Sequence, residues 1–233
     1  ACDLSQAFIQ ADKIEEGING RVFIRPPQGY PEERGIVYEV LRPLYGIPSS
    51  ARALHLTLSS WMKSMNFKTA GFEDSIWIRE ADSQFPHAIT MSSHIDDNLI
   101  ACKSLETLTA FKTAFLTRFD GTDEGEVRVY LGCEVIQDSV NGTIECRQSI
   151  YAQRMLNLYQ MKDCNPSPTP LSPGSRLSKA DSPEFIDPAV QRLYRGIVGH
   201  IGYLVSMTRC DLSFAYAELS KFVAYPGAVH LAA

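Results

Sequence analysis

The stretch SSHIDDNLIAC, residues 92–102, places two adjacent carboxylates, Asp96 and Asp97, in a segment that otherwise alternates like a buried strand. Their like charges repel, so holding them side by side needs a physical reason. A hairpin turn is one explanation, because Asp and Asn form turns and Asp97-Asn98 would then lie at the tip. A binding or catalytic site is the other, and this stretch alone leaves both open.

The composition is that of an ordinary soluble globular protein, with 233 residues, 45% hydrophobic and 21% charged. This length allows one large domain or two smaller ones. No apolar run approaches the roughly 20 residues of a membrane span, and no secretion signal is visible, so we expect no membrane partner. Six scattered cysteines argue against a zinc site or disulfide framework and favour a reducing intracellular compartment. The net charge of −5 weighs against nucleic-acid binding, although a basic groove can coexist with an acidic centre.

Hydrophobic periodicity and turn residues predict alternating strands and helices in the first two thirds of the chain. We expect strands over 21–25, 35–46 and 74–80, and two strands over 87–103 with the Asp pair at or beside their turn. Helices are expected over 49–65, behind capping serines, and over 104–119, with Ser104 as N-cap. The apolar face of the second helix is predicted to contain Leu105, Leu108, Phe111, Phe115 and Phe119. Residues 126–138 and 142–148 are predicted to be two strands joined through Asn141-Gly142.

The final third has a different character. A helix is expected over 150–161, followed by a Pro- and Ser-rich exposed linker over 163–185. Two further helices, over 189–207 and 211–227, carry small residues that allow close packing. This order of elements predicts an α+β fold with a helical C-terminal portion.

A third carboxylate, Asp3, also lies at the end of an expected strand. If that strand lies beside the Asp96-Asp97 hairpin, the three carboxylates converge, which is costly unless cations neutralise them. Mg²⁺ prefers oxygen ligands of this kind, and two such ions about 4 Å apart can hold the attacking and leaving oxygens of a phosphoryl displacement. The hypothesis is therefore nucleotidyl transfer, and it depends on that convergence.

Five segments in order carry a family resemblance: CDLSQAF (2–8), LYGIPSSAR (44–52), HIDD (94–97), YLGCEV (130–135) and YRGIVGHIGYLVSMTRCDLSFAYAELSKF (194–222). On these segments the chain resembles the reverse transcriptase of copia-type long-terminal-repeat retrotransposons over nearly its whole length. The resemblance implies a polymerase palm, a ferredoxin-like antiparallel sheet with helices on one face, plus a helical thumb and connection segment. Residues 1–147 would be the palm with partial fingers elements, 148–183 the thumb helix and linker, and 184–233 the connection segment.

The resemblance also implies the site. Asp3, Asp96 and Asp97 would bind two Mg²⁺ ions, for which Mn²⁺ can substitute, with the main-chain carbonyl of Leu4 as a further ligand. Ser5, Gln6 and Ala7 would lie along the incoming triphosphate, and Phe8 would be a steric gate against ribose. Gly46 would allow close backbone approach to the nascent base pair. Tyr130, Leu131 and Gly132 would form the primer grip, with YLGCEV as the primer-gripping hairpin. Read without the resemblance, Phe8 is a plain core residue and Gly132 a bulge.

The implied function is RNA-directed DNA polymerase, within a Pol polyprotein that also contains integrase and ribonuclease H. Its partners would be an RNA or DNA template with primer and dNTPs, and its location the cytoplasm, in virus-like particles, and the nucleus. We expect the fingers before Asp3 and the ribonuclease H domain after Ala233 to be missing from this chain. One alternative is an inactive, truncated or domesticated remnant that at most binds nucleic acid. Another is a nucleotidyl cyclase, although no GGDEF-like turn is present.

The sequence departs from the family pattern in several places. His94 replaces a tyrosine, Ser93 an apolar residue and Thr122 a common lysine. Pro48-Ser49-Ser50-Ala51 replaces Lys-Gln-Ala-Pro, and Cys210 replaces a proline. These changes put in doubt the packing around the metal strand and the identity of a proton donor to pyrophosphate. His94 is expected to be an ordinary strand residue that is packed or faces solvent.

Overall fold

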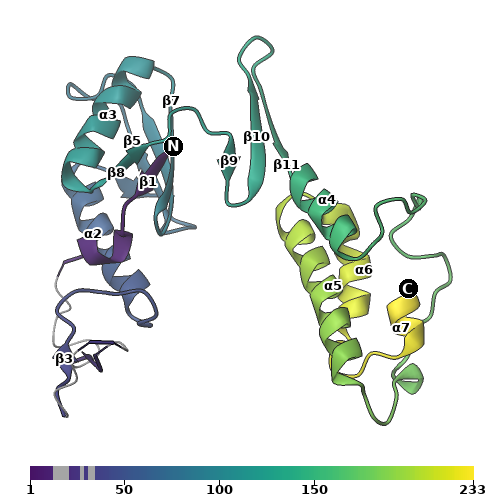
Figure 1. The fold of residues 1–233 in the computed structure, drawn as a ribbon. Coiled ribbons are helices and arrows are strands. Elements are labelled where there is room, and N and C mark those ends of the chain that lie inside the picture. The colour runs from purple at the N-terminus through teal and green to yellow at the C-terminus, as the bar shows by residue number, and fades with distance from the viewer. Residues whose placement is uncertain (13–20, 27–28, 31–34) are drawn as a thin grey trace. The chain divides into compact units, whose positions relative to one another are not determined.

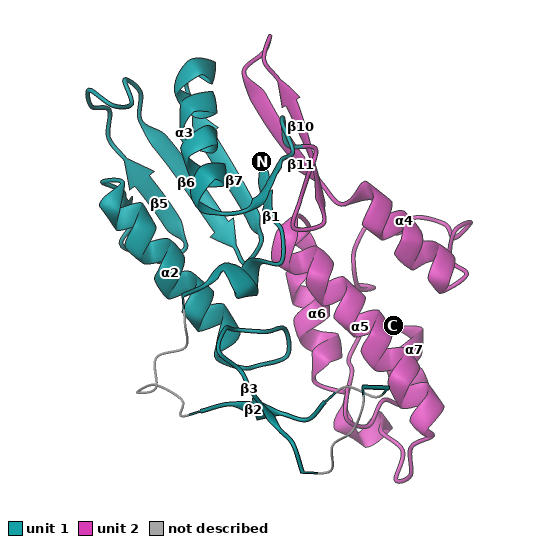
Figure 2. Cartoon of the chain, turned by 60° about the vertical axis from the view of Figure 1, so that its left-hand side comes forward, with its two compact units in different colours: residues 1–127 teal, residues 128–233 magenta. Residues whose placement is uncertain are grey.

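The computed structural model describes residues 1–12, 21–26, 29–30 and 35–233. They form two compact units, residues 1–127 and 128–233, which Figure 2 colours separately. The functional division expected from the resemblance, at 147 and 183, is of another kind and stays a prediction. The sequence also predicts a proline-rich turn after Arg25, and this turn lies partly outside the described residues. None of the described helices is both long and apolar enough to cross a membrane.

The first unit is built on a six-stranded sheet of order β4-β5-β6-β7-β1-β8 (Figure 1). Every pair of neighbouring strands in it is antiparallel. Its strands are β1 (Cys2–Leu4), β4 (Lys68–Thr69), β5 (Ile76–Arg79), β6 (Ile89–His94), β7 (Asp97–Cys102) and β8 (Gly121–Asp123). A separate two-stranded sheet pairs β2 (Phe23–Ile24) with β3 (Tyr38–Glu39).

Two helices, α2 (Ser50–Ser64) and α3 (Leu105–Arg118), lie side by side against one face of the six-stranded sheet (Figures 1 and 2). The core between them and the sheet is rich in aromatic rings. Phe111 and Phe115 of α3 and the following Phe119 are fully buried, and each ring contacts Trp61 of α2 in a tilted or edge-on arrangement. Among the described residues of this unit, no α-helix lies on the opposite face of the sheet (Figures 1 and 2).

The second unit consists of a three-stranded sheet and a group of helices. Its sheet, of order β11-β10-β9, contains β9 (Val129–Tyr130), β10 (Cys133–Asp138) and β11 (Thr143–Arg147). Its helices are α4 (Ser149–Leu158), α5 (Pro188–Met207), α6 (Ser213–Ser220) and α7 (Ala228–Ala232), with short 3-10 helices η2 (Lys179–Asp181) and η3 (Cys210–Leu212). Gly202 of α5 accommodates the ring of Tyr216 of α6, since an added Cβ would lie 2.7 Å from it. The small residues therefore do permit close packing.

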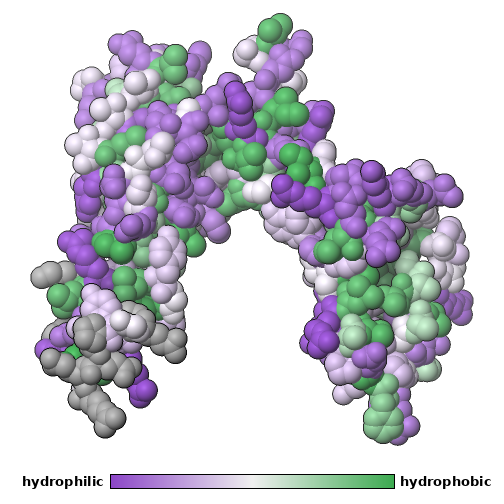
Figure 3. Space-filling view, viewed as in Figure 1, coloured by the Kyte–Doolittle hydropathy of each residue, from purple (hydrophilic) through white to green (hydrophobic). Residues whose placement is uncertain are grey.

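The hydrophobic core of the second unit is small. Its buried members are Tyr194, Val198, Leu219 and Phe222. Large apolar side chains such as Leu193 and Phe214 stay exposed, and hydrophobic surface gathers over the helices of this unit in Figure 3. The second unit therefore depends more on polar contacts between its elements than the first unit does.

The α+β class and most helices are confirmed, but several sequence-based expectations are wrong in detail. Ser49 makes no capping hydrogen bond at the start of α2, where Ser50 Oγ instead donates to the Leu44 carbonyl. Leu105 is 78% exposed, so it does not belong to the buried face of α3. Ser104 does cap α3, because its side chain accepts from the Thr107 N–H. The expected helix over 211–227 is short, ending at Ser220, and α7 and β8 were not anticipated.

One expected strand is two strands. Residues 126–138 read as a continuous strand, yet β9 and β10 are separated by a tight turn at Leu131-Gly132. Alternation of apolar residues runs through the turn and hides it. Residues 163–185, expected to be a linker, contain no helix or strand besides η2, and their role as a linker between functional parts stays a prediction.

Candidate active site

The carboxylates of Asp3 and Asp97, which are far apart in the sequence, lie on neighbouring strands of the sheet. In the antiparallel pair β1–β7, Asp3 lies directly opposite Asp97. The register places His94 beside Asp97 on β6 and Thr122 beside Asp3 on β8. Directly paired residues share a face of the sheet. One row, His94–Asp97–Asp3–Thr122, therefore crosses four strands on one face.

The neighbouring row shows which face this is. Ser93, Asn98, Cys2 and Asp123 occupy the same four strands one residue along. Cys2 and Asn98 are each 1% exposed, and Lys112 of α3 donates to Asp123 at 2.6 Å. This second row therefore faces the helices. The row that contains Asp3 and Asp97 faces away from α2 and α3, where His94 and Asp97 are exposed and Asp3 is half-buried.

The turn between β6 and β7 consists of Ile95 and Asp96, since His94 pairs with Asp97. The pair at the tip is thus Ile95-Asp96 and not Asp97-Asn98. Ile95 has a φ of 58°, a left-handed conformation that is strained for a β-branched residue. Such strain persists only where the surrounding structure holds it in place.

Two hydrogen bonds hold this turn from its own sheet. The Asp96 carbonyl accepts from the main-chain N–H of Leu4 at 3.0 Å and from Asn98 Nδ2 at 2.8 Å. Asn98 is buried, and its Oδ1 has no hydrogen-bond partner among the described residues. The position of Asp96 relative to the strand of Asp3 is therefore fixed by its main chain.

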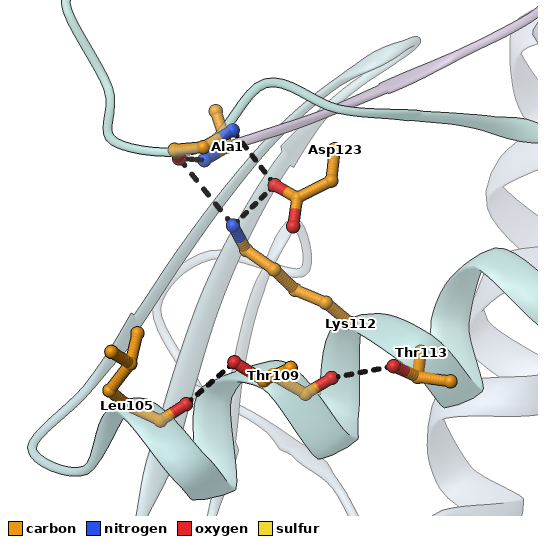
Figure 4. A network of polar contacts seen from close by, with 7 residues as sticks. Ala1, Leu105, Thr109, Lys112, Thr113 and Asp123 are labelled. Carbon is orange, nitrogen blue, oxygen red and sulfur yellow. Dashed lines mark hydrogen bonds and ion pairs between the residues drawn. The ribbon is translucent and has the colours of Figure 1, made fainter.

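Strand β8 is fixed on the other side of β1. Figure 4 shows Lys112 Nζ reaching Asp123 from α3. The Lys112 side chain is 9% exposed, so this ion pair lies at the edge of the core. An added Cβ on Gly121 would lie 2.3 Å from the Asp3 carbonyl oxygen, so only glycine allows β8 to approach β1 so closely.

The carboxyls of the two rows have opposite electrostatics. Loss of surrounding water is the largest cause that raises the pKa of Asp97, and the negative charges of Asp96 and Asp3 raise it further, against the opposing influence of His94. Partial burial also acts to raise the pKa of Asp123, but the hydrogen bonds from Lys112 and the Gly125 N–H outweigh it, and this pKa is lowered. The row with Asp3 and Asp97 therefore has excess negative charge, whereas Asp123 in the row that faces the helices is paired with a cation.

The segment after β1 is tied to the residue before β8. The Ser5 N–H donates to the Asp120 carbonyl at 3.0 Å. Gln10 joins both ends, since its Nε2 donates to the Ser5 and Asp120 carbonyls and its Oε1 accepts from the Asp120 N–H, each at 2.6 Å. Gln6 has a φ of 49° and begins the 3-10 helix η1 (Ala7–Gln10). Ser5 and Gln6 are exposed, while Ala7 is buried.

Phe8 lies in the core cluster and is 7% exposed. Its ring packs edge-on against Tyr45, with centroids 4.6 Å apart. Gly46, which follows Tyr45, has a φ of 87°, and a Cβ added to it would have no atom within 4 Å. Glycine is thus required at position 46 by its backbone conformation, and open space lies beside it. The structure brings the Phe8 segment and the LYG segment together, as one site would require.

The residues expected to grip the primer lie in the second unit, at the β9–β10 turn. Tyr130 pairs with Cys133, so Leu131 and Gly132 form a two-residue hairpin turn and not a bulge. Their φ values are 48° and 76°, the combination typical of a type I′ turn. The turn is held by Tyr203 of α5, whose hydroxyl donates to the Leu131 carbonyl at 2.7 Å.

The donor set fits a hard divalent cation in chemistry but is incomplete in arrangement. Two carboxylates oppose each other on an exposed face with a third beside them, and oxygen is the ligand that Mg²⁺ prefers. Among the described residues, however, no three His, Cys, Asp or Glu side chains are grouped closely enough to hold a metal ion. The site supplies negative charge and oxygens, and a bound ion would have to draw the side chains together.

Sequence reasoning missed three residues that shape the site in the first unit and one that shapes the β9–β10 turn in the second unit. Asn98 was interpreted as a turn former, although a polar residue at an inward position of an apolar strand was a signal for a buried anchor. Thr122 was noted only as a departure, and its place beside Asp3 depends on strand β8. Nothing in the local sequence marked Gln10 or Tyr203, because their partners are 110 and 72 residues away.

Comparison with known proteins identifies the family. The family described as reverse transcriptase (RNA-dependent DNA polymerase) matches residues 1–173. This range is well over half of the chain, and the chain therefore belongs to the reverse transcriptase (RNA-dependent DNA polymerase) family. The copia-type resemblance carried by the five segments is confirmed by the curated relatives.

Those relatives are transposon proteins. The retrovirus-related Pol polyprotein from transposon TNT 1-94 of Nicotiana tabacum is 25% identical over 98% of this chain and 17% of its own length. The corresponding polyprotein from transposon RE1 of Arabidopsis thaliana is 27% identical over 99% of this chain and 15% of its own length. A putative transposon Ty5-1 protein of Saccharomyces cerevisiae is 25% identical over 98% of this chain and 71% of its own length. The chain thus spans about a sixth of the two polyproteins. No solved structure gives a significant match.

Proposed function

We propose that the chain carries the catalytic centre of an RNA-directed DNA polymerase, which transfers a nucleotide from a dNTP to a primer 3′-hydroxyl. Residues 1–147 serve as palm with partial fingers elements, 148–183 as thumb helix and linker, and 184–233 as the connection segment. The observation that carries the proposal is the direct pairing of Asp3 with Asp97 on the exposed face of the first sheet. Membership of the reverse transcriptase family supports it.

The excess of negative charge in this row is the second support. An arrangement that only stabilised the fold would place a cation beside Asp97, as Lys112 lies beside Asp123. Instead, partial burial and then the neighbouring carboxylates raise the pKa of Asp97, a pattern typical of functional sites. The strained Ile95 and the two hydrogen bonds to the Asp96 carbonyl hold the pair in this arrangement.

In this proposal Asp3, Asp96 and Asp97 hold two Mg²⁺ ions, or Mn²⁺ in their place, with the Leu4 carbonyl as a further ligand. When bound, the ions supply charge stabilisation to the attacking and leaving oxygens. The segment fastened by Gln10 positions the triphosphate along Ser5, Gln6 and Ala7.

The remaining roles concern the sugar, the base pair and the primer. Phe8, supported by Tyr45, restricts the space for a ribose 2′-hydroxyl. The open space beside Gly46 receives the nascent base pair. The turn formed by Leu131 and Gly132, with Tyr130, holds the primer end. The macromolecular partners are a primed RNA or DNA template and the integrase and ribonuclease H of a Pol polyprotein, in cytoplasmic particles and the nucleus.

The test is extension of a DNA primer on an RNA template with dNTPs and Mg²⁺. Asp96→Ala should lower the rate of nucleotide addition by on the order of a hundredfold to a thousandfold or more, because it removes charge stabilisation at the reacting oxygens. Asp74→Asn is the matched control, since Asp74 is an exposed carboxylate in the same unit, before β5. Extension by Asp96→Ala at the wild-type rate would refute the assignment. Retention of primed template without any extension by the wild type would favour the inactive remnant.

A second readout does not need catalysis. Mg²⁺ that binds the folded chain should raise its melting temperature with increasing ion concentration. The shift should be lost in Asp97→Asn and retained in Asp74→Asn. An equal shift in all three proteins would show that the ion binds elsewhere.

A further inference from the structure

The turn between β9 and β10 is held at its base as well as at its tip. At the base, Glu134 of β10 accepts from the main-chain N–H groups of Ser149 and Ile150, at the start of α4. Free N–H groups at a helix start favour a carboxylate in this way. The hairpin is therefore fastened to α4 on the side away from its tip.

At the tip, Tyr203 and Gly132 fit each other. The Tyr203 hydroxyl donates to the Leu131 carbonyl, and an added Cβ on Gly132 would lie 2.3 Å from that hydroxyl oxygen. The nearest ring carbon would lie at 3.5 Å, which is an ordinary contact. Only a residue without a side chain leaves room for the hydroxyl at this turn.

The Tyr203 ring itself has little freedom. It packs against Tyr151 of α4, with ring centroids 4.6 Å apart. Tyr151 is held in turn by its hydroxyl, which lies 2.7 Å from His200 Nδ1. Buried Gln148, next to α4, accepts from Thr208 Oγ1 beyond the end of α5. The hydroxyl that meets the turn is thus supported by two helices.

We propose that Tyr203 is a positioning residue for the primer end, because its hydroxyl fixes the turn of Leu131 and Gly132 in the conformation that grips the primer. The assignment of this turn to the primer end rests on the proposed function. The anchoring itself does not, because all of its contacts lie within residues 128–233. Tyr203 touches the turn and not the reacting atoms, so its effect acts through the turn.

The chain contains a matched control on the same helix. Tyr194 of α5 also donates its hydroxyl to a main-chain carbonyl, that of Leu219, at 2.8 Å. Tyr203→Phe and Tyr194→Phe therefore remove the same chemical group and the same kind of hydrogen bond. Only the first should alter the turn, and loss of one such bond corresponds to about a fivefold change in a local equilibrium.

The first measurement is amide hydrogen exchange in the 233-residue chain. We expect exchange of residues 129–134 to quicken about fivefold in Tyr203→Phe and to stay at the wild-type rate in Tyr194→Phe. Unchanged exchange in Tyr203→Phe would overturn the inference, and so would an equal increase in both variants.

The second measurement uses the close contact itself. Gly132→Ala introduces the Cβ against the hydroxyl, and Tyr203→Phe removes that hydroxyl. The double variant should therefore bind primed template more tightly than Gly132→Ala alone and should melt at a higher temperature. A general loss of stability would make the double variant worse, so absence of this rescue would overturn the inference.

The third measurement separates positioning from folding. Below the melting temperature, Tyr203→Phe should slow addition of the first nucleotide about fivefold with an unchanged KM for dNTP, whereas Tyr194→Phe should match the wild type. If the wild type neither retains nor extends primed template, the proposed function fails. Amide hydrogen exchange and the melting temperature of the double variant then still test whether Tyr203 anchors the turn. If the wild type extends the primer and both variants match it, the inference fails and the proposed function stands.

Discussion

Two hairpin turns carry the third and fourth of the five family segments, and they are held in different ways. Ile95-Asp96 in the first unit and Leu131-Gly132 in the second are both two-residue turns with a non-glycine residue in the left-handed region. In each, a carbonyl of the turn accepts a hydrogen bond that fixes it. The donors of the first turn, Leu4 and Asn98, lie in its own sheet, whereas the donor of the second is a side chain 72 residues away.

The difference shows what fixes the conformation of each turn. The first turn lies in a six-stranded sheet with a large aromatic core, so its neighbours in the sheet can fix it. The second lies in a three-stranded sheet whose unit has a small core, and a tyrosine from a helix supplies the missing constraint. We expect the first turn to depend on burial and the second on a single polar contact.

The largest effect is expected from the buried anchor of the first turn. Asn98→Ala should lower the free energy of unfolding by about 2 kcal/mol, because the buried Asn98 side chain is lost together with its hydrogen bond to the Asp96 carbonyl. Both tryptophans, Trp61 and Trp77, lie in the first unit, so urea unfolding followed by tryptophan fluorescence reports this unit. Thr90→Ala, at an exposed position of the neighbouring strand, is the control. A loss no larger than that of Thr90→Ala would remove the distinction between the two turns.

A somewhat smaller loss is expected from the ion pair that supports β8. Asp123→Asn should lower the stability at pH 7 by about 1 to 2 kcal/mol, below the value for a fully buried pair because the Asp123 side chain is 45% exposed. The pKa of Asp123 is lowered in the folded state, so its contribution is present above the unfolded value of 3.8 and is lost as the pH falls through the folded pKa. Urea unfolding at pH 7 and pH 3, with Glu124→Gln as control, measures both effects. A loss of equal size at both pH values would contradict the ion-pair explanation.

A gain of stability is expected from relief of strain in the first turn. Ile95→Gly should raise the free energy of unfolding by about 1 kcal/mol, since the strain of a β-branched residue at positive φ outweighs the added freedom of the unfolded chain. Leu131→Gly should raise it less, because leucine is not β-branched. Primer extension should fall in Ile95→Gly while stability rises if the strain serves the site. Destabilisation by Ile95→Gly would show that the side chain matters more than the backbone.

The smallest effect concerns Asp97 and pH. Its pKa is raised in the folded state, so the folded chain binds the proton more tightly, and stability falls as pH rises from the unfolded value of 3.8 through the folded pKa. Asp97→Asn should therefore melt above the wild type at pH 7, and the difference should shrink as the pH is lowered toward 3.8. Asp74→Asn should show no such trend in the same melting series. A melting temperature below that of the wild type for Asp97→Asn at pH 7 would contradict this, because it would mean that another group stabilises the charged Asp97 carboxylate.

The local sequence was sufficient for elements whose signals lie within a few residues. Helix α3 was predicted with its cap, because Ser104 and the spaced aromatic residues are contiguous evidence. The hairpin was predicted with the Asp pair at or beside its turn, which is confirmed, whereas the alternative with Asp97-Asn98 at the tip was two residues too late. The residue pattern alone reads the turn at Leu131-Gly132 as strand, because its side chains continue the alternation on both sides, whereas the family resemblance implied the hairpin that is observed.

The sequence by itself determined the class of fold, the family and the residue types at the candidate site. Only the tertiary structure decided that Asp3 pairs with Asp97 and that Thr122 completes their row. The same holds for Gln10, which clamps Asp120, and for Tyr203, which holds the Leu131 turn. The physical reason is that strand register and side-chain anchoring join residues that are tens of positions apart, and local propensity contains no term for such contacts.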